Sequence, residues 1–246
     1  MNREKRFLVA AALMAVALLF ASRPILADSL SASYYVLSET DPDTNNNSGG
    51  VGLLMSTLGP DGLPMVNAAG LAALHDVNAN GELEWWSPSY VTVLNNPIYP
   101  STITLPFIDD YMYTNTTDLG HNGDDYEGFL TAEFQGNFNL ASPGTVTFSV
   151  CSDDDEFVYV DGTLVVDNGG IHPISCASPT NLSLGGGTHS LDVFYADREN
   201  VGATFQLTAD IGLTPPPTNA PEPGTLSLLS LGLIGLAWKP KKHLLG

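Results

Sequence analysis

The stretch from Cys151 to His172 constrains the fold most, because it predicts a β-hairpin. Its sequence, CSDDDEFVYVDGTLVVDNGGIH, holds two alternating apolar runs separated by Asp161 and Gly162. An Asp-Gly pair between such runs is a strong signal for a two-residue turn, because Gly readily adopts the positive φ of a type I′ turn. Three consecutive aspartates, Asp153 to Asp155, therefore lie where the chain enters the hairpin.

Other segments also have strand character. In Phe129–Leu140 the apolar residues Leu130, Ala132 and Phe134 take one face and polar residues take the other, which is typical of a half-buried antiparallel strand. Only residues 68–74 favour a short helix. Many short strands with regular turns predict an all-β fold, a two-sheet antiparallel β-sandwich. The further candidate strands are Ser29–Leu37 and residues 51–58, 145–150, 189–195 and 203–207.

The acidic triplet is a candidate calcium site. Adjacent carboxylates repel one another where they converge, and a divalent cation relieves that repulsion. Calcium prefers several oxygen ligands in a flexible shell. The alternative is a solvated acidic turn, and the spacing alone favours that alternative, because most runs of aspartate are of this kind.

A resemblance to a known domain family favours the calcium site over the solvated turn. The motifs SDDD, FVYVDGTLVVDNGGIH and GGGTHSLDVFYADREN follow one another between Asn122 and Asp210, and Tyr34-Tyr35 occupies a first strand. In this order they resemble the fibro-slime domain of the protective-antigen-like (PA-fourteen) superfamily, whose members are β-sandwiches. The resemblance implies one such domain over residues 28–212.

The resemblance also implies a site. In fungal adhesins of the superfamily, two adjacent aspartates joined by a cis peptide hold a calcium ion that contacts sugar. Those positions correspond to Asp153 and Asp154 here, with Asn200 as a further metal ligand. Asp155, Arg198 and Val201 are then expected around the ligand. Arg198 has an alternative role, in which it pairs with acidic residues and organises its loop.

A second calcium loop is left open in Asp76–Glu84. Asp76, Asn78, Asn80 and Gly81 match the first half of such a loop, but its twelfth position is Ser87 rather than Glu. An Asn/Gly turn is the better interpretation. The adjacent Trp85 and Trp86 would face opposite sides of a strand, one in the core and the other in packing or in sugar stacking.

Both ends of the chain have the composition of processed segments. Residues 1–27 predict a secretory signal peptide, with a basic start, an apolar run and Ala27 before the cleavage point. Residues 213–223 predict a Pro-rich linker. Residues 221–246, with Pro221-Glu222-Pro223, an apolar segment and a basic tail, resemble a PEP-CTERM sorting signal. That resemblance implies a Gram-negative cell, processing by an exosortase, and membrane contact only through this segment before processing.

The net charge of residues 28–220 limits the classes of molecule that the protein can bind. Two of the 27 acidic residues, Glu4 and Glu222, lie outside residues 28–220, which leaves 25 acids against Arg198 alone and a net charge of about −24. Such a surface repels nucleic acid and anionic lipid and attracts cations. The two cysteines, Cys151 and Cys176, predict a disulfide in an exported chain.

Two functional hypotheses follow. The first is a calcium-dependent carbohydrate-binding or adhesion module on the cell surface or in the extracellular matrix, with an extracellular polysaccharide or surface glycan as partner. The second is a structural, biofilm- or exopolysaccharide-associated matrix protein without a soluble ligand. Catalysis is not expected, because the histidines are scattered and no nucleophile elbow is present.

Overall fold

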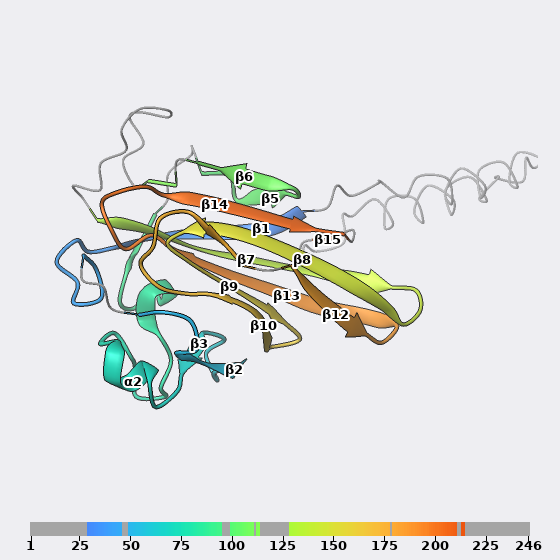
Figure 1. Ribbon diagram of the computed structural model, residues 1–246, viewed down its shortest axis with the longest axis horizontal. Coiled ribbons are helices and arrows are strands. Elements are labelled where there is room, and N and C mark those ends of the chain that lie inside the picture. Colours follow the sequence, from blue (N-terminus) through green and yellow to red (C-terminus); the bar gives the residue numbers. More distant parts are fainter. Residues whose placement is uncertain are drawn as a thin grey trace, which may run out of the picture. The chain divides into compact units, whose positions relative to one another are not determined.

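The computed structural model describes residues 29–45, 49–94, 99–110, 112–113, 128–177, 179–210 and 213–214 (Figure 1). The predicted signal peptide and the sorting segment lie outside these residues. So does the predicted linker, apart from Leu213–Thr214, which form a short strand.

The larger sheet follows the order β3-β2-β10-β9-β13-β7-β1-β4, with β15 also paired to β7 and β5 paired to β1. Every pairing in it is antiparallel. Its strands are β1 (Ser29–Leu37), β2 (Leu54–Leu58), β3 (Pro64–Val66), β4 (Thr92–Val93), β5 (Thr102–Thr104), β7 (Phe129–Leu140), β9 (Asp155–Val160), β10 (Thr163–Asn168), β13 (Gly187–Ala196) and β15 (Leu213–Thr214).

The smaller sheet follows the order β11-β8-β14-β6, with β12 also paired to β8, and is antiparallel throughout. Its strands are β6 (Phe107–Asp109), β8 (Gly144–Asp153), β11 (Ser175–Cys176), β12 (Thr180–Leu184) and β14 (Thr204–Ala209). The only helices among the described residues are the four-residue α2 (Gly70–Ala73) and the 3-10 turn η1 (Glu84–Trp86). The predicted two-sheet β-sandwich is confirmed.

Period-two alternation sorts the side chains into two cores. Val158 and Val193, on neighbouring strands β9 and β13, belong to the core that also contains side chains of the smaller sheet, such as Phe148 and Phe205. Phe157, Tyr159 and Phe194 point to the other face and pack in a second core with Trp85 and Trp86. The segment 49–91 covers that face, so β9 is buried on both sides. In Figure 1 this segment, with β2, β3 and α2, lies below β9 and β10.

The hairpin turn forms as predicted, with Asp161 at φ 50° and Gly162 at φ 69°. A bulge between Leu164 and Val166 then shifts the register of β10 against β9. The prediction for the tryptophan pair was wrong in its geometry: Trp85 and Trp86 lie in η1 rather than in a strand, and both are buried. Neither forms an exposed sugar-stacking platform.

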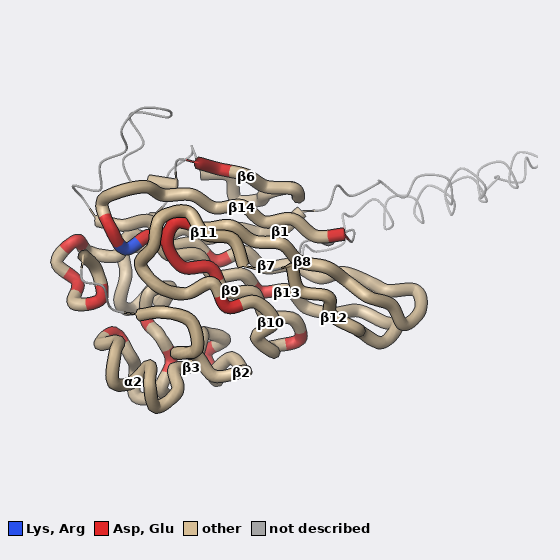
Figure 2. Tube along the Cα trace, viewed as in Figure 1, with Lys and Arg blue, Asp and Glu red and all other residues tan. Residues whose placement is uncertain are grey.

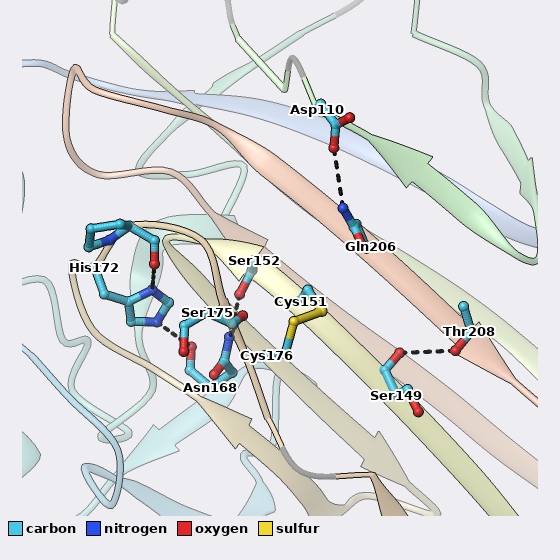
Figure 3. The surroundings of a disulfide bond; sticks show 11 residues. Asp110, Ser149, Cys151, Ser152, Asn168, His172, Ser175, Cys176, Gln206 and Thr208 are labelled. Carbon is cyan, nitrogen blue, oxygen red and sulfur yellow. Dashed lines mark hydrogen bonds between the residues drawn. A yellow bond between two sulfur atoms is a disulfide. The ribbon is translucent and has the colours of Figure 1, made fainter.

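Cys151 and Cys176 form a disulfide between β8 and β11 (Figure 3). The covalent link closes a loop with a sequence separation of 25, which contributes about 3 kcal/mol in the chain-entropy model. Beside it, Asn168 donates a hydrogen bond to the Ser152 hydroxyl (2.7 Å) and another to the Ser175 carbonyl (3.1 Å). The disulfide thus holds the segment after His172 against the strand that ends in the acidic triplet.

No helix among the described residues is long and apolar enough to span a membrane.

Candidate functional site

The acidic triplet lies where the chain passes from one sheet to the other. Asp153 is the last residue of β8 in the smaller sheet, and Asp155 is the first residue of β9 in the larger sheet. The peptide bond between Asp153 and Asp154 is cis. All three aspartates are buried. The site is therefore anchored by both sheets.

Asp154 connects two loops through backbone hydrogen bonds. Its Oδ1 accepts from the His172 N–H (2.8 Å) and its Oδ2 accepts from the Arg198 N–H (2.8 Å). Each carboxylate oxygen has a further lone pair, so these contacts leave room for a cation ligand. The loop after β10 and the loop after β13 therefore meet at this carboxylate.

Asp153 faces the loop between β13 and β14 at Gly202. A Cβ atom added to Gly202 would lie 2.2 Å from Asp153 Oδ2, and Gly202 has φ +88°. Only glycine permits so close an approach between backbone and carboxylate. The carboxylate thus sits in a cradle of main chain.

Burial raises the proton affinity of this pair. It raises the pKa of Asp153 above its ordinary value. For Asp154, burial first and then the charge of Asp155 raise the pKa to about 7, against hydrogen bonds from two backbone amides that lower it. The two carboxylates therefore carry negative charge that nearby groups compensate only in part.

The loop predicted to supply further ligands lies beside the pair, through Gly202 at Asp153 and the Arg198 amide at Asp154. Asn200 is exposed, and Val201 is 71% exposed. The structure thus brings Asp153, Asp154 and this loop together, with Asn200 and Val201 at the rim. Their roles as ligands stay predictions.

Asp155 and Arg198 form a buried ion pair. Arg198 Nε donates to Asp155 Oδ2 (2.7 Å) and Nη2 donates to Asp155 Oδ1 (3.2 Å). The guanidinium lies 4.3 Å from the ring centroid of Trp85, and Nη1 donates to the Asp43 carbonyl (2.8 Å). The Gly170 N–H also donates to Asp155. Arg198 thus takes the structural pairing that the sequence offered as its alternative role, with Asp155 as its partner, and the predicted contact of Asp155 with a ligand stays a prediction.

The basic member of this pair is the one basic side chain among many acidic ones in the described part of the chain. Figure 2 shows acidic positions in red along the start of β9 and in several loops, whereas Arg198 is the only Lys or Arg of the described residues. The residues that sequence reasoning missed are Gly202 and the backbone of His172. A glycine in the loop after Val201 was the available signal for the first, and the second has no signal in the side-chain pattern.

The half-matching calcium loop closes on itself. Asn78 Oδ1 accepts from the backbone amides of Asn80 (2.8 Å) and Glu82 (3.0 Å), and Asn78 Nδ2 donates to Glu82 Oε2 (2.9 Å). This is the Asn/Gly turn that the sequence favoured. The carboxylate of Asp76 lies outside this turn, close to the carboxylates of Asp41 and Asp43.

A separate acidic pair lies on neighbouring strands β7 and β13, at Glu133 and Asp192. Burial first and then the charge of Asp192 raise the pKa of Glu133 to about 7. Tyr35 and Gln135 donate to its two oxygens at 3.5 and 2.9 Å. The native state therefore binds a proton more tightly than the unfolded chain does.

Glu133→Gln is expected to stabilise the protein at pH 8 by about 1–3 kcal/mol. A raised native pKa makes a stability contribution that is fully present at pH 4 and is lost as the pH rises through 7, and Gln cannot ionise. Urea denaturation of both proteins at pH 4 and pH 8 measures the difference. At pH 4 the two curves should nearly coincide, and an equal difference at both pH values would contradict the assignment.

Two family models match parts of this chain. Residues 88–225 match the PA14 domain model, and residues 219–242 match the PEP-CTERM protein-sorting motif. Protein psiB of Dictyostelium discoideum is 32% identical over 71 residues, which are 28% of this chain and only 13% of that protein's length.

Two solved structures are similar at low identity. A PA14 sugar-binding domain from an RTX adhesin is 16% identical with a TM-score of 0.36, covering 74% of this chain and 88% of that one. A subtype-switched epithelial adhesin A domain from Candida glabrata, in complex with beta-lactose, is 12% identical with a TM-score of 0.36, covering 80% and 84%. By its family match over more than half of its length, this chain belongs to the PA14 domain family and carries a PEP-CTERM sorting motif at its C-terminal end.

Proposed function

We propose that this chain is an exported cell-surface or matrix protein of a Gram-negative bacterium, of the fibro-slime kind, whose PA14 domain binds extracellular carbohydrate in a calcium-dependent manner. Asp153 and Asp154 supply the carboxylates that hold the ion. Oxygens of Asn200 and of the Val201 backbone supply further ligands. The protein acts as a binding module and not as an enzyme.

The cradle around Asp153 is the observation that carries the proposal. Two adjacent carboxylates converge with a loop backbone that a single Cβ atom at Gly202 would push away. Burial raises the pKa of both carboxyl groups, so their negative charge is incompletely compensated. Calcium takes carboxylate and backbone oxygens in a flexible shell of six to eight ligands. The donor set therefore fits this ion.

The rim of the site suits a sugar. Val201 and Ile174 are 71% and 53% exposed; Val201 precedes Gly202, which faces Asp153, and Ile174 lies two residues after His172, whose N–H donates to Asp154. Sugar hydroxyls are oxygen ligands that can complete a calcium shell, while the apolar side chains can contact a ring face. Asn200 lies exposed on the same loop.

The C-terminal sorting motif supports export. On this proposal an exosortase processes the chain near Pro221-Glu222-Pro223, and the apolar segment contacts the membrane only before that step. The excess of acidic residues in residues 28–220 keeps the mature surface away from anionic lipid and nucleic acid.

The variant Asp153→Asn with Asp154→Asn tests the function. On a glycan array, the wild type is expected to bind at least one glycan in calcium and to lose that signal in chelator. The variant should lose it even in calcium, because neutral amides hold the ion far less tightly than carboxylates. Asp61→Asn with Asp210→Asn removes two charges outside the site and should bind like the wild type. Chelator-resistant binding, or equal binding by the Asp153/Asp154 variant, would refute the proposal.

A matrix-structural role is the second candidate. It is favoured by the hydrogen bonds through which Asp154 ties two loops together, since an ion there would stabilise the fold without any sugar. Calcium-dependent stability of the wild type with no glycan bound on the array would select this role.

A further inference from the structure

Three aspartates from two loops meet beside the 3-10 turn η1. Asp41 and Asp43 follow β1, and Asp76 follows α2. All three residues are buried, and one carboxylate oxygen of each lies within 4.8 Å of the others. Among the described residues this is the only such group of three potential metal ligands. It does not include the acidic triplet of the proposed carbohydrate site.

Asp43 is the most fully hydrogen-bonded member. Its carboxylate accepts from the backbone amides of His75 (2.9 Å) and Asp76 (3.1 Å) and from Trp85 Nε1 (3.3 Å). The His75 ring nitrogen Nδ1 lies 3.0 Å from the same group. These donors orient the Asp43 carboxylate toward the segment that contains Asp76.

Asp41 and Asp76 share the Tyr90 hydroxyl as a donor, and Asp41 Oδ1 also accepts from the Asp43 N–H (2.9 Å). The Tyr90 hydroxyl lies 2.8 Å from Asp41 Oδ2 and 2.5 Å from Asp76 Oδ1, but it has only one proton to donate. Asp76 Oδ2 is buried and has no hydrogen-bond partner among the described residues, and Asp76 is 5% exposed. A buried carboxylate oxygen without a partner is costly, so this atom points to a ligand that is not part of the chain.

The charge of the cluster supports the same conclusion. Burial first, and then the neighbouring Asp41 carboxylate, raise the pKa of Asp76 to about 8. The guanidinium of Arg198 reaches the Asp43 backbone carbonyl, but its charge is paired with Asp155. A cation bound by Asp41, Asp43 and Asp76 would compensate the negative charge that the Arg198 guanidinium leaves uncompensated.

We propose that Asp41, Asp43 and Asp76 form a second divalent-cation site, with calcium as its ion, independent of Asp153 and Asp154. Calcium binds carboxylate oxygens at about 2.3–2.6 Å, so two oxygens on opposite sides of the ion lie about 4.6–5.2 Å apart. One oxygen of each carboxylate lies within 4.8 Å of the other two, so the three are close enough together to share one ion. A surface cavity of about 460 Å³ reaches the edge of the cluster, where Asp41 and Tyr90 form part of its lining.

The ion at this site joins loops that are remote in sequence. It links the segment after β1 to the segment that leads into η1. The first of these segments also holds the Arg198 loop, since the Asp43 carbonyl accepts from Arg198 Nη1 (2.8 Å) and the Asn45 N–H donates to the Arg198 carbonyl (2.8 Å). The role of the ion is therefore to stabilise this end of the sandwich.

Calcium stoichiometry of the full chain separates the two sites. By isothermal titration, the wild type is expected to bind two ions per chain. The variant Asp153→Asn with Asp154→Asn should still bind one, and calcium should still raise its melting temperature. Adding Asp41→Asn and Asp76→Asn to it should abolish both effects. Adding Glu39→Gln instead, an exposed carboxylate in the same loop, should leave both unchanged.

The proposal fails if the Asp153/Asp154 variant binds no calcium, a result that does not depend on whether the Asp41/Asp76 variant folds. A cluster that shares a proton instead of a cation would give that result, with stability independent of calcium. The carbohydrate proposal fails separately, if Asp41→Asn with Asp76→Asn alone abolishes all calcium binding or if no glycan is bound. A higher affinity for magnesium than for calcium would also overturn the assignment of the ion.

Discussion

Replacing Arg198 by Met is expected to lower the free energy of unfolding by about 3–5 kcal/mol, because it leaves the buried carboxylate of Asp155 without a cation. The guanidinium donates to both oxygens of Asp155, lies over Trp85 and holds the Asp43 carbonyl. Arg198 is fully buried, so water cannot replace these contacts. Urea denaturation at neutral pH measures the loss.

A double-mutant cycle identifies the pair as the cause. Arg198→Met combined with Asp155→Asn leaves neither charge buried, so the double variant should be more stable than Arg198→Met alone. Arg198→Lys keeps the charge but loses the planar fork, and it should fall between the wild type and Arg198→Met. A cost below about 1 kcal/mol for Arg198→Met, or a double variant that is no more stable than it, would contradict the structural role.

Gly202→Ala is expected to abolish the calcium response of the Asp153–Asp154 site while the protein still folds. The new Cβ would lie 2.2 Å from Asp153 Oδ2, so either the carboxylate or the loop must move. Because both supply proposed ligands, either movement opens the shell. Calcium binding and glycan binding by the variant measure the effect, with one ion of the wild-type stoichiometry lost.

The matched control is Gly62→Ala. Gly62 has φ +81°, close to the +88° of Gly202, but no atom of the described residues lies within 4 Å of its Cβ position. Both variants therefore incur the same backbone cost of about 1–2 kcal/mol for an L-residue in the left-handed region. Only Gly202→Ala should change calcium binding. If Gly202→Ala binds calcium as tightly as the wild type, the close approach of Gly202 to Asp153 is not part of the calcium site.

Local pattern was sufficient for the long strands at the centre of the sheets, but not for short strands such as β3, β5 and β12. The alternation in Phe129–Leu140 predicted β7 because successive side chains in a strand point to opposite faces. The Asp161-Gly162 pair predicted the hairpin because positive φ is a property of one or two residues. The acidic triplet was likewise assigned correctly to the entry of this hairpin, since its position follows from the turn alone.

The contacts of the acidic side chains depended on tertiary structure. Nothing local distinguishes Asp155, which pairs with Arg198, from Asp153, which faces Gly202. The 3-10 turn at Trp85-Trp86 likewise packs in a core that residues of segment 49–91 and of the larger sheet build together. These features join parts of the chain that only the packing brings together.

The sequence by itself therefore determined the sandwich, the hairpin and the place of the acidic triplet within it, because strand and turn preferences act over a few neighbouring residues. The tertiary structure alone decided which acids converge. Asp41 and Asp76 are 35 positions apart, and they meet only because the loops after β1 and α2 pack against the same 3-10 turn. A carboxylate carries the same charge wherever it lies, so its sequence position does not reveal whether water, arginine or a cation will compensate it.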